Sequence, residues 1–185
     1  GLNIHDLAGN VEYEEAAYLL LFGSMPTATQ LAKFKKDLAA NRKLPKGILD
    51  LIKSTPKKAV PMDTLRTAIS ALAFYEKDVD DISVEATRRK GIRLVAQFPS
   101  VVAAIQRARK GKAIVSPKAA MGHAENFFYM LHGVKPNKLE TDSMNLYLVL
   151  LADHSLNAST FTARVASSTN ADLHAAVTAA LGALK

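Results

Sequence analysis

The stretch at residues 145–166, NLYLVLLADHSLNASTFTARVA, is the most informative part of the sequence. It begins with an apolar run that is typical of a buried helix and leads directly into the polar pair Asp153-His154. A polar turn follows, and then a segment rich in Ala, Ser and Thr that extends to Ala183. Because small side chains let helix backbones approach closely, this part of the chain favours a multilayered helical core.

Helical periodicity extends over the remainder of the 185 residues, and no alternating strand pattern interrupts it. The pattern predicts an all-α fold, a compact multi-helix bundle of about eight helices in a single domain over residues 1–185. The expected helical regions are 10–22, 27–38, 45–52, 61–73, 83–108, 125–131, 142–152 and the small-residue region 158–183.

Helix ends are predicted from capping residues. Gly23 and Gly133 are expected to terminate helices, and Pro61 suits a first helical position. Pro99 should break or kink the helix in which it lies. The predicted N-caps are Asn10, Thr27 in a capping box with Gln30, Ser83 and Asp142.

Composition argues against several classes of protein. There is no cysteine, so disulfides and thiolate metal sites are not expected. No apolar run approaches the roughly 20 residues of a membrane helix, and we expect a cytoplasmic protein with no membrane partner. The histidines outside the Asp153-His154 pair show no metal-ligand spacing, so no metal site is predicted.

The formal net charge is +7, and its basic residues fall in clusters. Such clusters indicate either solvated helix faces or attraction of an anionic partner. Because they contain few aromatic residues and match no nucleic-acid-binding motif, we expect no nucleic-acid partner.

The polar segment Asp153, His154 and Asn157 is the candidate site. An imidazole beside a carboxylate can be charged or strongly oriented, which suits a carboxylate ligand. The helix start that follows offers free N–H groups, which suit an anion. The alternative is structural, with Asp153 fixing His154 and with Asn157 or Ser159 capping the next helix. The residues alone leave both interpretations open.

The same segment closely resembles the citrate synthase family. The resemblance is carried by Asp153-His154-x-x-Asn157-Ala158-Ser159-Thr160-Phe161 and by the Thr162-Ala163-Arg164-Val165-Ala166 that follows. Short matches elsewhere are weak one by one, but they are collinear over nearly the whole chain. They are residues 14–21 with Gly23 and Pro26, residues 61–68, residues 126–133 and residues 180–185.

Members of this family condense acetyl-CoA with oxaloacetate to give citrate and CoA, and close relatives use propionyl-CoA to make 2-methylcitrate. The resemblance implies that His154 and Asn157 bind oxaloacetate and that Asp153 supports them. It implies no cofactor, because acetyl-CoA is a substrate. It also implies that the chain is the N-terminal and central part of the family's large helical domain, which forms a homodimer.

The resemblance further implies a truncated enzyme. In family members a Gly-Pro-Leu-His-Gly segment directly follows the position of Lys185, and a second His, a general-base Asp and several carboxylate-binding Arg residues follow it. We therefore expect no catalytic residue in this chain and no activity alone, with acyl-CoA a ligand only of the full-length parent. Leu151 and Val60 stand where many members have His.

Three alternatives stay open. The chain is part of a citrate synthase or 2-methylcitrate synthase, or a non-catalytic module with that fold, or an unrelated basic helical domain that binds nucleic acid. For the first two, the family's dimer helix falls at residues 61–75. We expect its apolar positions to form the seam between two copies: Met62, Leu65, Ile69 and Leu72.

Overall fold

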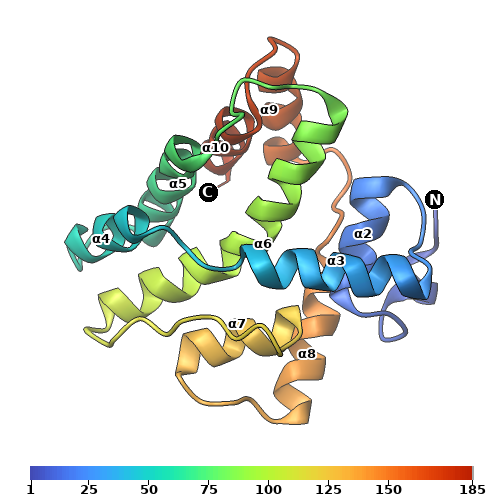
Figure 1. Ribbon diagram of the computed structural model, residues 1–185, viewed down its shortest axis with the longest axis horizontal. Coiled ribbons are helices and arrows are strands. Elements are labelled where there is room, and N and C mark those ends of the chain that lie inside the picture. The colour runs from blue at the N-terminus through green and yellow to red at the C-terminus, as the bar shows by residue number, and fades with distance from the viewer. Residues whose placement is uncertain (185) are drawn as a thin grey trace.

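The computed structural model describes residues 1–184, which form ten α-helices and one 3-10 helix and contain no strand (Figure 1). The all-α prediction is confirmed. Lys185, with which the predicted domain ends, lies outside the described residues. The elements are α1 (Ile4–Leu7), α2 (Tyr13–Phe22), α3 (Ala28–Asn41), α4 (Lys46–Ser54), α5 (Pro61–Ala71), η1 (Leu72–Tyr75), α6 (Val84–Arg109), α7 (His123–His132), α8 (Lys138–Leu150), α9 (Ala158–Ser167) and α10 (Leu173–Ala183).

The central element is α6, which crosses the molecule between the other helices (Figure 1). It contacts α3, α4, α5, α7 and α10. As predicted, Ser83 caps its first turn, and the Ser83 hydroxyl accepts a hydrogen bond from the Ala86 N–H at 3.3 Å. Pro99 lies inside α6, and the helix continues beyond it to Arg109. Pro99 therefore does not break the helix, and Figure 1 shows α6 changing direction along its length.

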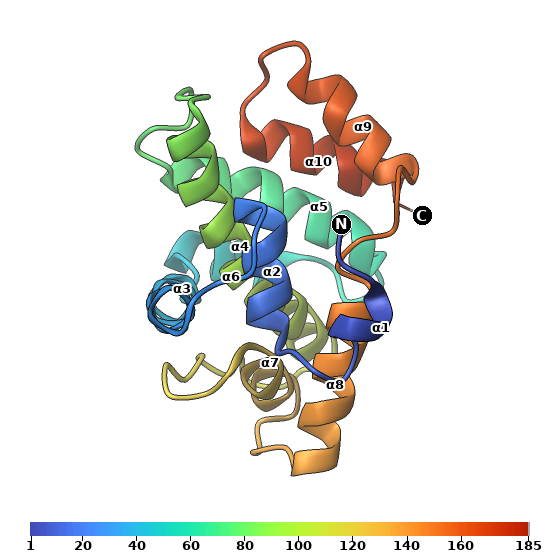
Figure 2. The ribbon, with the colours of Figure 1, turned by 90° about the vertical axis from the view of Figure 1, so that its right-hand side faces the viewer.

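Two clusters of buried apolar side chains share α6. The larger cluster joins α4, α5 and α10 to α6 through residues that include Ile48, Ile69, Val101 and Leu181. The smaller cluster joins α2 and α3 to α6. Figure 2 shows α9 and α10 side by side next to α5 at one end of the molecule, and α7 with α8 at the other.

Most predicted helix ends are confirmed. Thr27 and Gln30 form the predicted capping box at the start of α3. Gly23 and Gly133 end α2 and α7 in the left-handed conformation, each with φ of 84°. Pro61 is the first residue of α5. Each of these helix ends is set by residues close to it in the chain, so local sequence patterns predict its position.

The two other predicted N-caps are wrong. Asn10 lies in a turn, and α2 begins after Glu12, whose N–H donates to the Glu15 carboxylate at 2.8 Å. Asp142 lies inside α8, where it forms an ion pair with Lys138. A competing cap, Asn137, starts α8 one turn earlier by accepting from the Glu140 N–H at 2.9 Å.

The small-residue region 158–183 contains two helices, because the chain turns at residues 168–172 between α9 and α10. Asp172 caps α10 by accepting from the His174 and Ala175 N–H groups. Together with the short α1, this turn accounts for the difference between about eight expected helices and the observed ten.

The structure is inconsistent with Leu65, Ile69 and Leu72 as a seam between two copies, and Met62 packs partly buried against the same cluster, while dimerisation itself stays a prediction. Leu65, Ile69 and Leu72 are buried within this chain, with exposed fractions of 9%, 0% and 2%, and they belong to the larger core cluster. Their helical spacing marks the inner face of α5, which packs on α6 and α10. The outer face instead presents Thr67 and Ser70, and beyond them Phe74 of η1, which is 87% exposed.

Candidate functional site

The segment singled out in the sequence connects α8 to α9. Figures 1 and 2 both show the chain rising from α8 to α9 along one side of the molecule. Asp153 and His154 are exposed on this connector, and Ser155 turns the chain with φ of 53°. Within residues 1–184, His154 makes no side-chain hydrogen bond and no ion pair with Asp153. The imidazole is therefore exposed to solvent and accessible to a ligand.

Asn157 is the N-cap of α9. Its side-chain oxygen accepts hydrogen bonds from the Thr160 N–H at 2.8 Å and from the Ser159 hydroxyl at 2.7 Å. The capping role considered from sequence is thus present. The amide N–H2 group makes no hydrogen bond among the described residues, so the cap still leaves a donor beside the first turn of α9.

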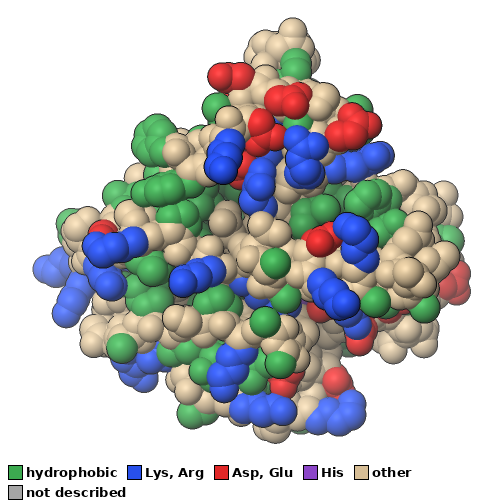
Figure 3. Space-filling model, in the orientation of Figure 1, with side chains coloured by type: hydrophobic (Ala, Val, Ile, Leu, Met, Phe, Trp, Pro, Cys, Tyr) green, Lys and Arg blue, Asp and Glu red, His purple; other side chains and the backbone are tan. Residues whose placement is uncertain are grey.

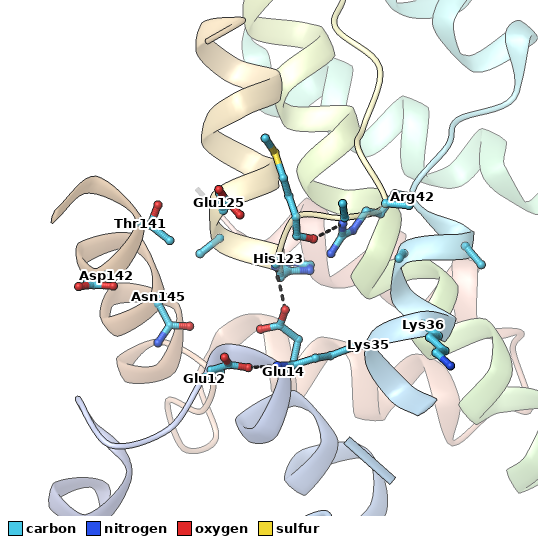
Figure 4. A pocket seen from close by; sticks show the side chains of 17 residues that line it. Glu12, Glu14, Lys35, Lys36, Arg42, His123, Glu125, Thr141, Asp142 and Asn145 are labelled. Carbon is cyan, nitrogen blue, oxygen red and sulfur yellow. Dashed lines mark hydrogen bonds and ion pairs between the residues drawn. The ribbon is translucent and has the colours of Figure 1, made fainter. Parts of the chain in front are cut away.

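A separate hollow of about 720 Å³, with both alanine and charged side chains in its lining, lies between α2, α3, α7 and α8 (Figure 4). Three ionisable side chains in its lining are buried, and each comes from a different part of the chain: Glu14, Arg42 and His123. At its edge, Glu12 pairs with Lys35, and Glu125 pairs with Lys135 at 3.3 Å. Most of the charges around the hollow are therefore already paired within the chain.

His123 begins α7 and is 4% exposed. Its backbone N–H donates to Glu14 Oε1 at 2.8 Å, and its ring lies 4.7 Å from that of Tyr13. Its Nδ1 has no hydrogen-bond partner within the described chain. Burial, with a smaller contribution from the charge of Arg42, lowers the pKa of His123 to about 4. The imidazole is therefore neutral at pH 7.

Arg42 joins the end of α3 to the loop before α7. One guanidinium nitrogen donates to the carbonyl oxygens of Lys118 at 3.0 Å and Met121 at 2.7 Å, and the latter bond is drawn in Figure 4. The Arg42 carbonyl in turn accepts from the Ser100 hydroxyl at 2.8 Å. Burial lowers the pKa of the guanidinium. These bonds hold α3, α6 and α7 together, so the hollow is built chiefly from structural contacts.

Sequence reasoning did not identify this buried group. Glu14 entered the sequence analysis only within the family match at residues 14–21, Arg42 was not singled out, and His123 was one of the histidines without metal-ligand spacing. Their burial depends on contacts between distant segments, which the sequence does not show. Among residues 1–184, no group of three or more His, Asp or Glu side chains is placed to hold a metal ion. Over the same residues, no helix combines the length and apolar character needed to cross a membrane.

Comparison with known proteins identifies the family to which this chain belongs. The profile described as "Citrate synthase, C-terminal domain" matches residues 1–185. The chain belongs to the citrate synthase family. It is 43% identical to a citrate synthase of Deinococcus radiodurans over 185 residues, which cover all of this chain and 49% of that protein. It is 42% identical over 190 residues to 2-methylcitrate synthase 2 of Corynebacterium glutamicum, covering all of this chain and 50% of that protein.

The fold of this citrate synthase family member agrees with that assignment. A citrate synthase of Thermoplasma acidophilum, solved as a ternary complex with carboxymethyl coenzyme A and oxaloacetate, is 29% identical and superimposes with a TM-score of 0.92. The match covers 98% of this chain and 48% of that one. The chain thus spans about half the length of the relatives that it matches.

Proposed function

We propose that this chain is the oxaloacetate-binding part of a citrate synthase or 2-methylcitrate synthase and that it does not complete the reaction alone. The observation that carries the proposal is the family match over residues 1–185, which include the Asp153–Asn157 segment. The 43% and 42% identities to the two kinds of enzyme are nearly equal, so the proposal leaves the acyl group open.

The geometry of the connector suits a dicarboxylate ligand. His154 offers an exposed imidazole that can donate a hydrogen bond to a carboxylate or carbonyl oxygen. Asn157 offers its amide N–H2 group beside the first turn of α9, where free backbone N–H groups favour negative charge. A polarised oxaloacetate carbonyl is the electrophile that the condensation needs. Enolisation of the acyl-CoA requires an acid–base pair, which we assign to the part of the enzyme that this chain does not span.

Replacing His154 with alanine should weaken oxaloacetate binding about 10-fold or more, because a hydrogen bond to a charged group contributes about 1.5–3 kcal/mol. Titration calorimetry with oxaloacetate would measure this change. His5→Ala is the matched control, because His5 is also exposed but lies on α1. Equal affinity in wild type and His154→Ala would refute the assignment of His154.

We also expect that the chain alone releases no CoA thiol from acetyl-CoA and oxaloacetate. Steady release of CoA thiol by the purified chain would contradict the proposal that it does not complete the reaction alone.

We further propose that two copies pair through the outer face of α5 and η1. This face contains a shallow hollow of about 360 Å³ lined by Arg66, Thr67, Ser70, Ala71, Phe74 and Thr178. A phenylalanine that is 87% exposed beside such a hollow is typical of an interaction surface.

Phe74→Asp should therefore convert a dimer into a monomer, because the carboxylate would have to be buried at the contact. Sedimentation equilibrium over a range of concentrations measures the association. Leu139→Asp is the control, because Leu139 is 75% exposed on α8 at the other end of the molecule. A wild-type chain that is monomeric throughout, or a Phe74→Asp chain that still dimerises, would count against this face.

A further inference from the structure

The connector between α8 and α9 is distinguished by its backbone rather than by its charge. On the face seen in Figure 3, Lys and Arg side chains are spread over many helices instead of gathering at one place. Within residues 1–184, only two residues other than glycine have a positive φ, Ser155 at 53° and Asn170 at 61°. Asparagine accepts this left-handed conformation readily, whereas serine rarely adopts it. Ser155 therefore has the least expected backbone conformation among the non-glycine residues described.

The conformation of Ser155 is maintained from outside, by the two helices that the connector joins. The Ser155 side chain is exposed, and its hydroxyl makes no hydrogen bond within residues 1–184. On α8, the Asn145 amide donates to the Val11 carbonyl oxygen at 3.0 Å and accepts from the Tyr13 N–H at 2.7 Å. Helix α9 packs along α10. The connector must therefore turn between two fixed ends, and its left-handed residue is Ser155.

This turn separates the two residues that we assign to oxaloacetate. His154 directly precedes Ser155, and Asn157 follows it by two residues as the N-cap of α9. Because φ at Ser155 sets the direction of the chain between them, a change of that angle would move the imidazole relative to the amide. An unfavourable backbone conformation that no packing contact of its own side chain requires is typical of functional sites, where the surrounding structure maintains it.

We infer that Ser155 is a positioning residue, whose left-handed backbone holds His154 and Asn157 in the arrangement that binds oxaloacetate. The inference rests on the proposed function and deepens it, because it assigns the geometry of that site to one backbone angle. The backbone of Ser155 acts here, and its hydroxyl does not. Residues that accept a positive φ should therefore replace serine without loss.

Substitutions that differ in their tolerance of a positive φ separate the backbone of Ser155 from its side chain. Glycine and asparagine accept this conformation, whereas the β-branched valine does not. Ser155→Gly and Ser155→Asn should bind oxaloacetate within about 2-fold of wild type. Ser155→Val should bind it about 10-fold more weakly or worse. Asn170→Val is the matched control, because it places the same side chain at a positive φ in the turn between α9 and α10.

Two measurements follow the site, and one of them needs no ligand. Titration calorimetry measures the affinity for oxaloacetate, and amide hydrogen exchange at Thr160 reports the position of Asn157. The Thr160 N–H donates to the Asn157 side chain at 2.8 Å, so displacement of this cap exposes the amide to exchange. Exchange at Thr160 should be about 10-fold faster in Ser155→Val and unchanged in Ser155→Gly and Asn170→Val. The thermal unfolding midpoint should fall by similar amounts in the two valine variants, so lower stability alone would not explain a loss confined to Ser155→Val.

Three results would overturn the inference. Loss of affinity in Ser155→Gly as large as in Ser155→Val would assign the effect to the serine side chain. Wild-type affinity or wild-type Thr160 exchange in Ser155→Val would show that the angle does not position the site. Equal losses in Ser155→Val and Asn170→Val would show a general effect of lower stability. If the wild-type chain binds no oxaloacetate, the proposed function fails, and Thr160 exchange then decides whether Ser155 positions Asn157.

Discussion

Lowering the pH from 6.5 to 4 should destabilise this protein by about 3 kcal/mol through His123 alone, because its pKa is about 4 when folded and about 6.5 when unfolded. Between these values the unfolded chain binds a proton that the folded chain does not bind. Stability is therefore complete above pH 6.5 and decreases as the pH falls toward 4. The cause is the burial of the ring beside Tyr13, where an imidazolium would be poorly solvated, with a smaller contribution from the charge of Arg42.

Urea unfolding at a series of pH values, followed by circular dichroism, measures this effect. His123→Phe should remove most of the slope between pH 6.5 and 4, and it keeps the backbone N–H that donates to Glu14. His5→Phe should keep the slope, because His5 is exposed. His174, whose pKa is also lowered by burial, contributes in the same direction, as do Asp78 and Asp81, whose pKa values are lowered by hydrogen bonds. An unchanged slope in His123→Phe would show that His123 is not the group that titrates.

The second large effect is expected at Lys90, which is fully buried in α6 with an exposed fraction of 0%. Its ammonium group donates three hydrogen bonds, to the carbonyl oxygens of Asp78 at 3.0 Å, Val79 at 2.9 Å and Asp81 at 2.6 Å. Lys90→Met keeps the apolar stem but leaves three buried acceptors without a donor. We expect a loss of about 3–5 kcal/mol in the free energy of unfolding.

Denaturant unfolding at pH 7 measures the loss, and Lys77→Met is the control because Lys77 is exposed in the same loop region. Hydrogen exchange should also accelerate in residues 76–83, whose turn Lys90 holds. A loss below about 1 kcal/mol in Lys90→Met would mean that water replaces the ammonium group without cost.

These buried polar residues also show where sequence reasoning stops. Thr27, Ser83, Gly23 and Gly133 were identified correctly because each acts on a backbone group within a few residues of itself. Asn10 and Asp142 were misplaced because a competing cap lay nearby, at Glu12 for one helix and at Asn137 for the other.

Side-chain burial could not be predicted in the same way. Lys90, Arg42 and Glu14 are charged residues in ordinary helical patterns, and only the packing of distant segments determines that they are enclosed. The apolar spacing of α5 correctly identified a buried face, but sequence alone did not show whether α6 or a second copy covers it. The candidate site was located through the family motif at Asp153–Asn157, and the structure adds that this segment is an exposed connector.

The position of α6 has a consequence for how the protein unfolds. Leu94, Val101 and Ile105 of this helix belong to one buried cluster, while Ala96 belongs to the other. Neither cluster can lose its packing without disturbing the helix on which the other depends. Melting of α6 therefore removes both clusters at once, and partly unfolded states that keep only one cluster are disfavoured. The two clusters form one cooperative folding unit, in which a local perturbation at either end lowers the stability of both clusters.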